Sequence, residues 1–342
     1  MSRGAQELFH TNTLGWLMEH HPRAMAPVRR AFGDTSPDGP VETWREHRHL
    51  DLIVRNADDT ARYVVENKLY SIPNSGQLER YARVGLPWSD KHGPCGAERT
   101  SYFLLSLMEP NFQLPQPWSR VSYEELHAAL TAVPTETLGP DAELFDRYLV
   151  LVHRLVGLKA DVDPRNDLDG PFSVRKTLEA LDMKWFSGPL QRMRFTGLAQ
   201  SIAEVYGAPV PLEVNLTRGL GLLSYRRDLS DTRSIGWQLQ EGQLRLYVLI
   251  RDEGLTGKGD RLAAARAKVA QAEYADFVDF STPEMVLGPR LTPMKLDEGE
   301  WRRFAPDFVY RYRKVSEDAT TRQLADTLAE LTAHVDHWNP PS

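Results

Sequence analysis

The stretch LDLIVRNADDTARYVVENKLY, residues 50–70, contains two strand-like runs that decide the fold of the first half of the chain. The runs 50–55 and 61–70 are rich in β-branched and aromatic residues, which favour strands over helices. The polar residues 56–60 between them suit a short connection. The stretch therefore predicts an antiparallel β-hairpin.

Side chains alternate between the two faces of a strand, and this alternation gathers charged groups on one face of the hairpin. Glu66 and Lys68 share a face of the second strand, and Asp51 has the corresponding place in the first. If residues 57–60 form the loop, Asp51 lies directly opposite Glu66, with Cβ atoms about 5 Å apart. Two carboxylates at that distance repel each other unless a cation lies between them.

A hard divalent cation such as Mg²⁺ suits two such carboxylates, with the main-chain carbonyl of Asn67 as a further ligand. Lys68 could then orient or deprotonate a water molecule, or stabilise charge on a phosphoryl group. An acid and a lysine two positions apart are also common on strand surfaces, so that pair by itself is weak support. Here Asp51 and Glu66 are both flanked by apolar residues, where an uncompensated charge is costly.

The rest of the chain alternates predicted helices and strands around this hairpin. The first half has expected helices at 6–20, 75–84, 123–132 and 143–158, a turn-rich loop at 33–40 and a buried strand at 101–107. The polar segment 159–171, with two prolines, is the expected linker. The second half has expected helices at 173–186, 190–206, 260–278 and 318–337, and strand-like runs at 212–227, 235–251 and 307–315.

These patterns predict an α/β fold in two parts. The first part, 1–160, should hold a mixed β-sheet flanked by helices, and the second, 161–342, a C-terminal α+β region that contacts substrate, a partner or another protomer. Whether the second half is a separate domain or extends the first sheet stays open at this point.

The composition limits the classes of protein that this chain can belong to. Its net charge is −6, which argues against a protein that coats nucleic acid by charge alone. Cys95 is the one cysteine, so an internal disulfide is excluded and a reducing, cytoplasmic location is expected. No apolar run approaches the roughly 18 residues that span a bilayer, and Met1 to His10 lacks the profile of a signal peptide.

Three further motifs make the hairpin more specific. After the hairpin segments DLIV (51–54) and VVENKL (64–69) comes the helical QLERY (77–81), and ELFHTNTLGWLMEHHP (7–22) precedes them. In this order the motifs resemble the PD-(D/E)XK nuclease superfamily. They are similar in particular to a bacterial branch with an E-x-x-H first helix and a QLxRY helix.

The resemblance implies a restriction-endonuclease-like core and a set of site residues. It covers roughly residues 5–130. By position it implies Asp51 and Glu66 as metal ligands, Lys68 as the catalytic lysine, Glu7 as the first-helix acid that supports the metal site, and Gln77 and Tyr81 as residues of the active-site helix. The last two are four positions apart and therefore share a helix face. The sequence departs from the family pattern at His49, where arginine is usual, and at Leu50, where proline is usual.

Other motifs permit different interpretations. The string His47-Arg48-His49-Leu50-Asp51 resembles a zinc-binding HxHxD motif, but Leu52 stands where that motif needs a further histidine; a solvated or phosphate-contacting pair is the better hypothesis. The segment GLTGKG, 254–259, lacks the residues of a P-loop. The run FVYRYRK, 308–314, interleaves aromatic and basic residues. Together with Arg226 and Arg227 it could form a nucleic-acid contact carried by a strand. The alternative is an ordinary amphipathic strand with a solvated basic face.

The sequence thus predicts a nuclease that depends on Mg²⁺, or on Mn²⁺ in its place, and hydrolyses phosphodiester bonds, with DNA as the expected substrate. A role in defence against foreign DNA, such as that of phage, follows only by analogy with the superfamily. The alternative is a catalytically weak nucleic-acid-binding or regulatory subunit that retains the fold. For either protein, a homo-oligomer or a protein partner is a further expectation.

Overall fold

The computed structural model describes residues 4–59, 62–69, 75–84, 100–110, 112–180, 187–217, 220–240, 242–251, 260–292, 301–305 and 307–340. The chain divides into two compact units, Met1–Asp161 and Val162–Ser342. Within the described ranges, no helix has both the length and the apolar character needed to cross a bilayer.

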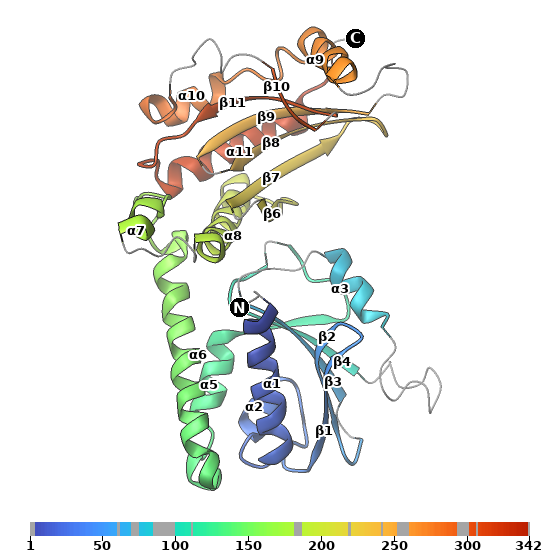
Figure 1. The fold of residues 1–342 in the computed structure, drawn as a ribbon, viewed down its shortest axis with the longest axis vertical. Coiled ribbons are helices and arrows are strands. Elements are labelled where there is room, and N and C mark those ends of the chain that lie inside the picture. Colours follow the sequence, from blue (N-terminus) through green and yellow to red (C-terminus); the bar gives the residue numbers. More distant parts are fainter. Residues whose placement is uncertain are drawn as a thin grey trace. The chain divides into compact units, whose positions relative to one another are not determined.

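Unit 1 is an α/β unit built on a mixed sheet with the strand order β1-β2-β3-β4-β5 (Figure 1). The first three strands are antiparallel, and β3, β4 and β5 run parallel. The strands are β1 (Val41–His47), β2 (Leu50–Asn56), β3 (Arg62–Lys68), β4 (Thr100–Ser106) and β5 (Trp118–Ser122). The helices are α1 (Gly4–His20), α2 (Ala26–Ala31), α3 (Ser75–Ala82), α5 (Tyr123–Thr131) and α6 (Ala142–Val162), with 3₁₀ turns at Thr135–Thr137 and Gly139–Asp141.

Helices cover both faces of this sheet. On one face α1 packs against β1, β2 and β3, and the hydroxyl of Tyr63 donates to Met18 Sδ at 3.6 Å. On the other face Leu78 of α3 packs with the buried strand residues Ile53, Val64 and Leu104. Burial of each large aliphatic side chain stabilises the fold by about 1.5–3 kcal/mol, so both layers contribute to holding the hairpin in place.

Two strands of unit 1 are not expected from the sequence. β1 turns into β2 at Arg48 and His49, which have φ values of 50° and 75°, and Glu46 also has a positive φ. Such left-handed residues are those of a two-residue hairpin turn, which usually uses glycine or asparagine. Because this turn contains neither glycine nor asparagine, the sequence does not predict it. β5 is short and leads directly into α5, whose N-terminus Ser122 caps.

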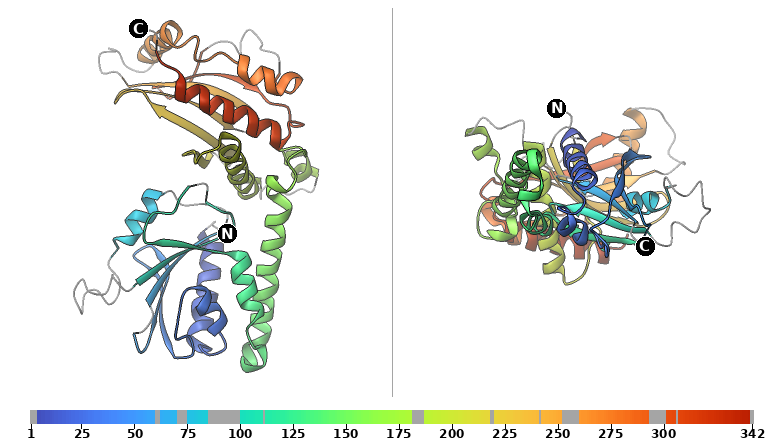
Figure 2. Two further views of the ribbon diagram at one scale, coloured as in Figure 1. Left: turned by 180° about the vertical axis from the view of Figure 1, so that it is seen from behind. Right: turned by 90° about the horizontal axis from the view of Figure 1, so that it is seen from below.

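Unit 2 contains an antiparallel sheet with the strand order β10-β11-β9-β8-β7-β6. Its strands are β6 (Glu213–Thr217), β7 (Leu220–Asp228), β8 (Arg233–Gln240), β9 (Gln243–Ile250), β10 (Arg302–Ala305) and β11 (Phe308–Lys314). Its helices are α7 (Arg175–Ala180), α8 (Ser187–Tyr206), α9 (Asp260–Glu273), α10 (Ser281–Leu287) and α11 (Thr321–His337), with 3₁₀ turns at Pro164–Asn166 and Gly288–Arg290. Figure 1 and its reverse view in Figure 2 show α11 lying along one face of this sheet.

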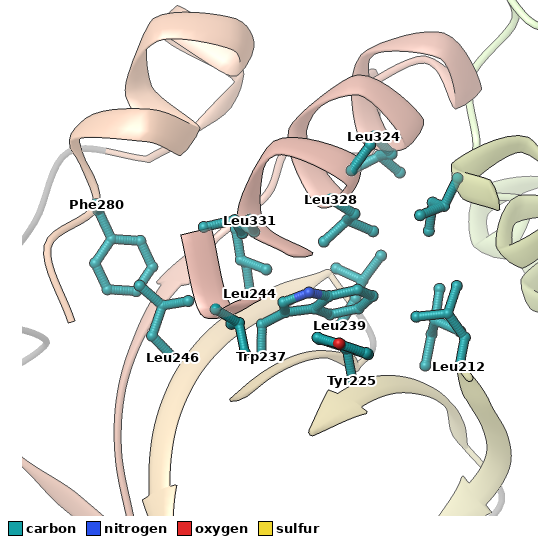
Figure 3. Packing of buried hydrophobic residues seen from close by; sticks show 14 of the residues in the cluster. Leu212, Tyr225, Trp237, Leu239, Leu244, Leu246, Phe280, Leu324, Leu328 and Leu331 are labelled. Carbon is teal, nitrogen blue, oxygen red and sulfur yellow. The ribbon is translucent and has the colours of Figure 1, made fainter. Parts of the chain in front are cut away.

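The core of unit 2 fills the space between the sheet and α11 (Figure 3). Trp237 of β8 lies at its centre, fully buried beside Leu328 and Leu331 of α11. Its indole Nε1 donates to Thr332 Oγ1 at 3.1 Å, so the polar atom of this buried ring has a partner.

The predicted strands of unit 2 need three corrections, and the helix expected at 260–278 ends at Glu273. The run 212–227 contains two strands, β6 and β7, whose connection at 218–219 lies outside the described residues. The run 235–251 is likewise two strands, β8 and β9, with Gly242 at φ 72° in the turn. β10 is not expected from the sequence at all, because only four residues form it.

The segment 159–171 is packed structure instead of an irregular linker. α6 continues to Val162, and Pro164 in the following 3₁₀ turn is buried. The Arg194 guanidinium donates to the carbonyls of Val162, Pro171 and Phe172 at 2.7–3.1 Å. The Val162 and Pro171 carbonyls of this segment therefore have partners within the fold, although its polar residues and prolines are typical of a linker.

Candidate active site in unit 1

The hairpin β2–β3 has the register that the loop length predicts. Leu52 pairs with Val65, and Arg55 pairs with Arg62. Continued by one pair, this register brings Asp51 opposite Glu66, so their side chains share a face. Asp51 Oδ2 accepts a hydrogen bond from the backbone N–H of Asn67 at 2.8 Å, which ties the aspartate to the neighbouring strand.

Three carboxylates converge on the Lys68 ammonium. Lys68 Nζ lies 2.7 Å from Glu66 Oε1, 3.7 Å from Glu7 Oε2 and 3.8 Å from Asp51 Oδ2. Glu66 is 1% exposed, and the Lys68 side chain is 13% exposed. Four predicted site residues, drawn from α1, β2 and β3, thus form one nearly buried cluster.

Asn67 holds the first helix against this cluster. Its side chain points away from Glu66, donating from Nδ2 to the Glu7 carbonyl at 2.9 Å and accepting from the Tyr123 hydroxyl at 2.8 Å. The Glu7 carboxylate in turn accepts from the backbone N–H of Leu69 at 3.1 Å. Asn67 therefore has a clear positioning role through its side chain, in addition to the ligand role predicted for its main-chain carbonyl.

Burial and crowding of charge shift the acid–base properties of the cluster. Burial, and next the charge of Asp51, raise the pKa of Glu66 to about 8, although Lys68 opposes this. Burial also raises the pKa of Asp51, against the opposing charge of Lys68. For Lys68, burial alone would lower the pKa, but the charges of Glu66, Asp51 and Glu7 together raise it above its ordinary value. Groups perturbed in this way are typical of functional sites.

The Glu66 carboxyl should make stability depend on pH in the metal-free protein. The folded state keeps its proton up to a pKa of about 8, whereas the ordinary value is 4.5. Between these values the folded state binds more protons, so the free energy of unfolding should fall as pH rises from 4.5 towards 8, by up to about 1.4 kcal/mol per unit of pKa shift.

Glu66→Gln cannot titrate and should lack this contribution. Urea unfolding in EDTA should therefore show the variant gaining stability relative to the natural protein as pH rises from 5 to 8. Glu143→Gln, an exposed acid of α6 paired with Arg147, serves as the control. A difference between Glu66→Gln and the natural protein that is constant over this range contradicts the raised pKa.

The oxygen donors of the cluster fit a hard divalent cation. Among the described residues no group of three His, Cys, Asp or Glu side chains has metal-binding spacing. The predicted set needs fewer side chains, because it combines Asp51 and Glu66 with the Asn67 main-chain carbonyl. Glu66 Oε2 is buried without a hydrogen-bond partner in the described part of the chain, and such an oxygen is suited to a cation.

Gln77 and Tyr81 form a pair on α3. Gln77 Nε2 donates to the Tyr81 hydroxyl at 2.8 Å, as their spacing along the helix predicts. The Tyr81 ring packs against the cluster of apolar side chains that contains Val64 and Leu104. α3 therefore covers the same sheet face that carries Glu66. Gln77 contacts Tyr81, and Tyr81 contacts the apolar side chains of this face.

Arg120 is a site neighbour that the sequence does not reveal. Its Nε donates to Ser106 Oγ at 3.0 Å, and Ser106 lies beside Lys68 in the parallel pairing of β3 and β4. One of its guanidinium nitrogens, NH2, is buried without a hydrogen-bond partner among the described residues. A basic residue in β5, which is itself not expected, gives no signal in the sequence that could have identified it.

The competing motifs do not form a second site within the described residues. His47 ends β1 opposite Leu50, and His49 is exposed in the tight turn, so the HxHxD string builds the β1–β2 turn. His10, which follows Glu7 by three positions, is buried against Tyr148, and burial lowers its pKa to about 4. The segment 254–259 lies outside the described residues.

The comparisons with known proteins add no relative. No family model matches this chain, and no curated protein and no solved structure matches it either. The resemblance to the PD-(D/E)XK nucleases therefore rests on the motifs in the sequence.

Proposed function

We propose that this chain is a metal-dependent nuclease that hydrolyses phosphodiester bonds, with DNA as its substrate. In this proposal unit 1 is a restriction-endonuclease-like core. The observation that supports it best is the convergence of Glu7, Asp51 and Glu66 on Lys68 in one nearly buried cluster. These residues come from three different elements, α1, β2 and β3.

The residues of the cluster would divide the work of phosphodiester hydrolysis. Asp51, Glu66 and the Asn67 carbonyl would hold Mg²⁺, or Mn²⁺, which when bound supplies Lewis-acid stabilisation of phosphoryl charge. Lys68 would orient the attacking water and stabilise the charge that develops on the phosphoryl oxygens. Glu7 would keep the Lys68 ammonium in place, and Arg120, which donates to Ser106 beside Lys68, would contact a phosphate of the substrate.

The proposal is tested by incubating the protein with supercoiled plasmid and with linear DNA in Mg²⁺, Mn²⁺ or EDTA. Cleavage should occur with either metal and stop in EDTA. Asp51→Asn should weaken metal binding by at least the roughly 10–100-fold that loss of a supporting group costs, as measured by calorimetry. If the natural protein cleaves neither DNA with either metal, or if Asp51→Asn binds metal equally well, the assignment is wrong.

A second candidate is a nucleic-acid-binding or regulatory subunit that keeps the fold without strong catalysis. The 2.7 Å contact between Lys68 and Glu66 favours it, because the Lys68 ammonium already supplies a positive charge beside the buried Glu66 side chain. In that case the protein should bind DNA in Mg²⁺ and leave it intact. A role in defence against foreign DNA is part of the first proposal by analogy only.

A further inference from the structure

The sheet of unit 2 has two faces of different character. In β11 the side chains of Phe308, Tyr310 and Tyr312 point to one face of the sheet. Those of Val309, Arg311 and Arg313 point to the other. Val309 is fully buried in the core that packs against α11. Phe308, Tyr310 and Tyr312 are half-buried on the opposite face and do not belong to that core.

Four aromatic rings form a continuous row on this second face. Tyr247 of β9 pairs directly with Tyr310 and stacks on Phe308, with ring centroids 4.7 Å apart and an interplanar angle of 21°. Phe308 and Tyr310 are 5.6 Å apart, and Tyr310 and Tyr312 are 6.4 Å apart. We call these four residues the aromatic row.

Gly236 of β8 allows the row to lie close to the sheet. It pairs with Tyr247, and a Cβ atom at this position would come within 2.7 Å of the Tyr247 hydroxyl oxygen. The missing side chain lets Tyr247 reach across β8 and donate to the Tyr225 carbonyl at 3.1 Å. Gly236 thus allows the Tyr247 ring to lie close to the backbone of the sheet.

Cations lie between and beside the rings. The Arg245 guanidinium lies 5.2 Å from the centroid of Tyr310, and its Nε is buried without a hydrogen-bond partner in the described part of the chain. Arg226 pairs with Gly236 on the same face, with its side chain 48% exposed and 3.3 Å from Asp228. Lys314 continues the alternation of β11 and is exposed.

Three of the basic residues grouped with this strand by sequence, Arg227, Arg311 and Arg313, belong to the other face; Arg311 pairs with the core residue Leu246. Arg313 is buried and donates to the Thr292 carbonyl at 2.7 Å. Arg227 donates to the carbonyls of Val335 and Trp338 at the end of α11. The alternation therefore separates structural arginines from the cations that accompany the aromatic row.

We propose that this face of unit 2 binds single-stranded nucleic acid, with bases stacked on Phe308, Tyr310 and Tyr312, which the buried Tyr247 supports, and with phosphates near Arg226, Arg245 and Lys314. Cations interleaved with aromatic rings complement a chain that is at once a polyanion and a series of flat bases. The spacings of 5.6 and 6.4 Å exceed the roughly 3.4 Å between duplex bases. Bases on these rings are therefore spread apart, which a duplex does not permit.

This binding does not rest on the proposed hydrolysis, and its test needs no catalysis. Fluorescence anisotropy in EDTA measures binding of labelled oligothymidylate and oligouridylate of about 16 nucleotides, beside a DNA duplex of the same length. Both single strands should bind more tightly than the duplex. Tighter binding of one oligonucleotide identifies DNA or RNA as the preferred ligand. Equal affinity means that the surface accepts both.

Two sets of variants separate stacking from charge. The double variant Tyr310→Ala, Tyr312→Ala should weaken single-strand binding about tenfold or more. Arg226→Gln with Lys314→Gln should lower the slope of log affinity against log salt by about 1.4. Arg322→Gln, an exposed arginine paired with Asp169, is the matched control and should bind normally.

Circular dichroism and melting curves establish that each variant is folded. If the aromatic variant is unfolded, Tyr310→Leu and Tyr312→Leu keep apolar bulk without an aromatic face and should still lose affinity. The proposal is overturned by a natural protein that does not bind single strands, by equal or tighter duplex binding, or by folded aromatic variants with unchanged affinity.

Discussion

Replacing Lys68 by methionine should reduce the rate of DNA cleavage by about three orders of magnitude, in the range for loss of a general acid–base group. Methionine keeps most of the length of the side chain and removes the ammonium that lies 2.7 Å from Glu66. Single-turnover cleavage in saturating Mg²⁺ measures the effect. Because Lys68 is not among the proposed metal ligands, metal binding measured by calorimetry should persist.

Lys159→Met is the matched control for this substitution. Lys159 also pairs with an acid, Glu124, at the surface of unit 1, and its replacement should leave the cleavage rate unchanged. Lys68→Met also removes the compensating charge from buried carboxylates, so its melting temperature must be compared with that of Lys68→Arg, which keeps a cation. Undiminished cleavage by folded Lys68→Met would exclude this lysine from the reaction.

Replacing Arg29 by methionine should lower the free energy of unfolding by about 3–5 kcal/mol, the usual cost of removing one partner of a buried ion pair. The side chains of Arg29 and Asp34 are both 0% exposed, and Arg29 Nε donates to Asp34 Oδ2 at 2.9 Å. Arg29 also donates to Asn56 Oδ1 at 2.8 Å and to the Gly39 carbonyl at 2.6 Å. One guanidinium thus joins α2, the loop 33–40 and the end of β2.

Urea unfolding at neutral pH measures this loss, with Arg30→Met as the control. Arg30 follows Arg29 in α2 and is exposed, so its replacement should change stability by less than about 0.5 kcal/mol. A double variant, Arg29→Met with Asp34→Leu, should recover part of the loss because it leaves no unpaired buried charge. A loss below 1 kcal/mol for Arg29→Met would show that the pair contributes little.

The hairpin could be predicted because its information is local. The loop of polar residues sets the pairing of Arg55 with Arg62, and alternation then carries Asp51 and Glu66 to the same face. The spacing of Gln77 and Tyr81 likewise predicts a shared helix face, and their hydrogen bond agrees with it. In each case residues close in sequence are joined by one regular element.

Features that depend on distant segments or on unusual backbone could not be predicted. Arg120 meets Ser106, the residue that pairs with Lys68, only because β5, β4 and β3 pair in parallel, across segments far apart in the chain. The polar residues and two prolines of 159–171 are typical of a linker, whereas the hydrogen bond from Arg194 to the Val162 carbonyl joins positions some thirty residues apart. The β1–β2 turn uses left-handed residues without glycine. The sequence therefore gives no turn signal there and does not predict β1.

The sequence by itself determined the α/β character of the chain, the register of the β2–β3 hairpin and the shared face of Asp51, Glu66 and Lys68, because alternation and loop length act within a few residues. Only the tertiary structure decided how these groups meet Glu7, how Asn67 and Tyr123 hold α1 against them, and which distant carbonyls Arg227 and Arg313 bind. Those contacts form when separate elements pack, and the free energy that selects them comes from burial and pairing across the whole unit.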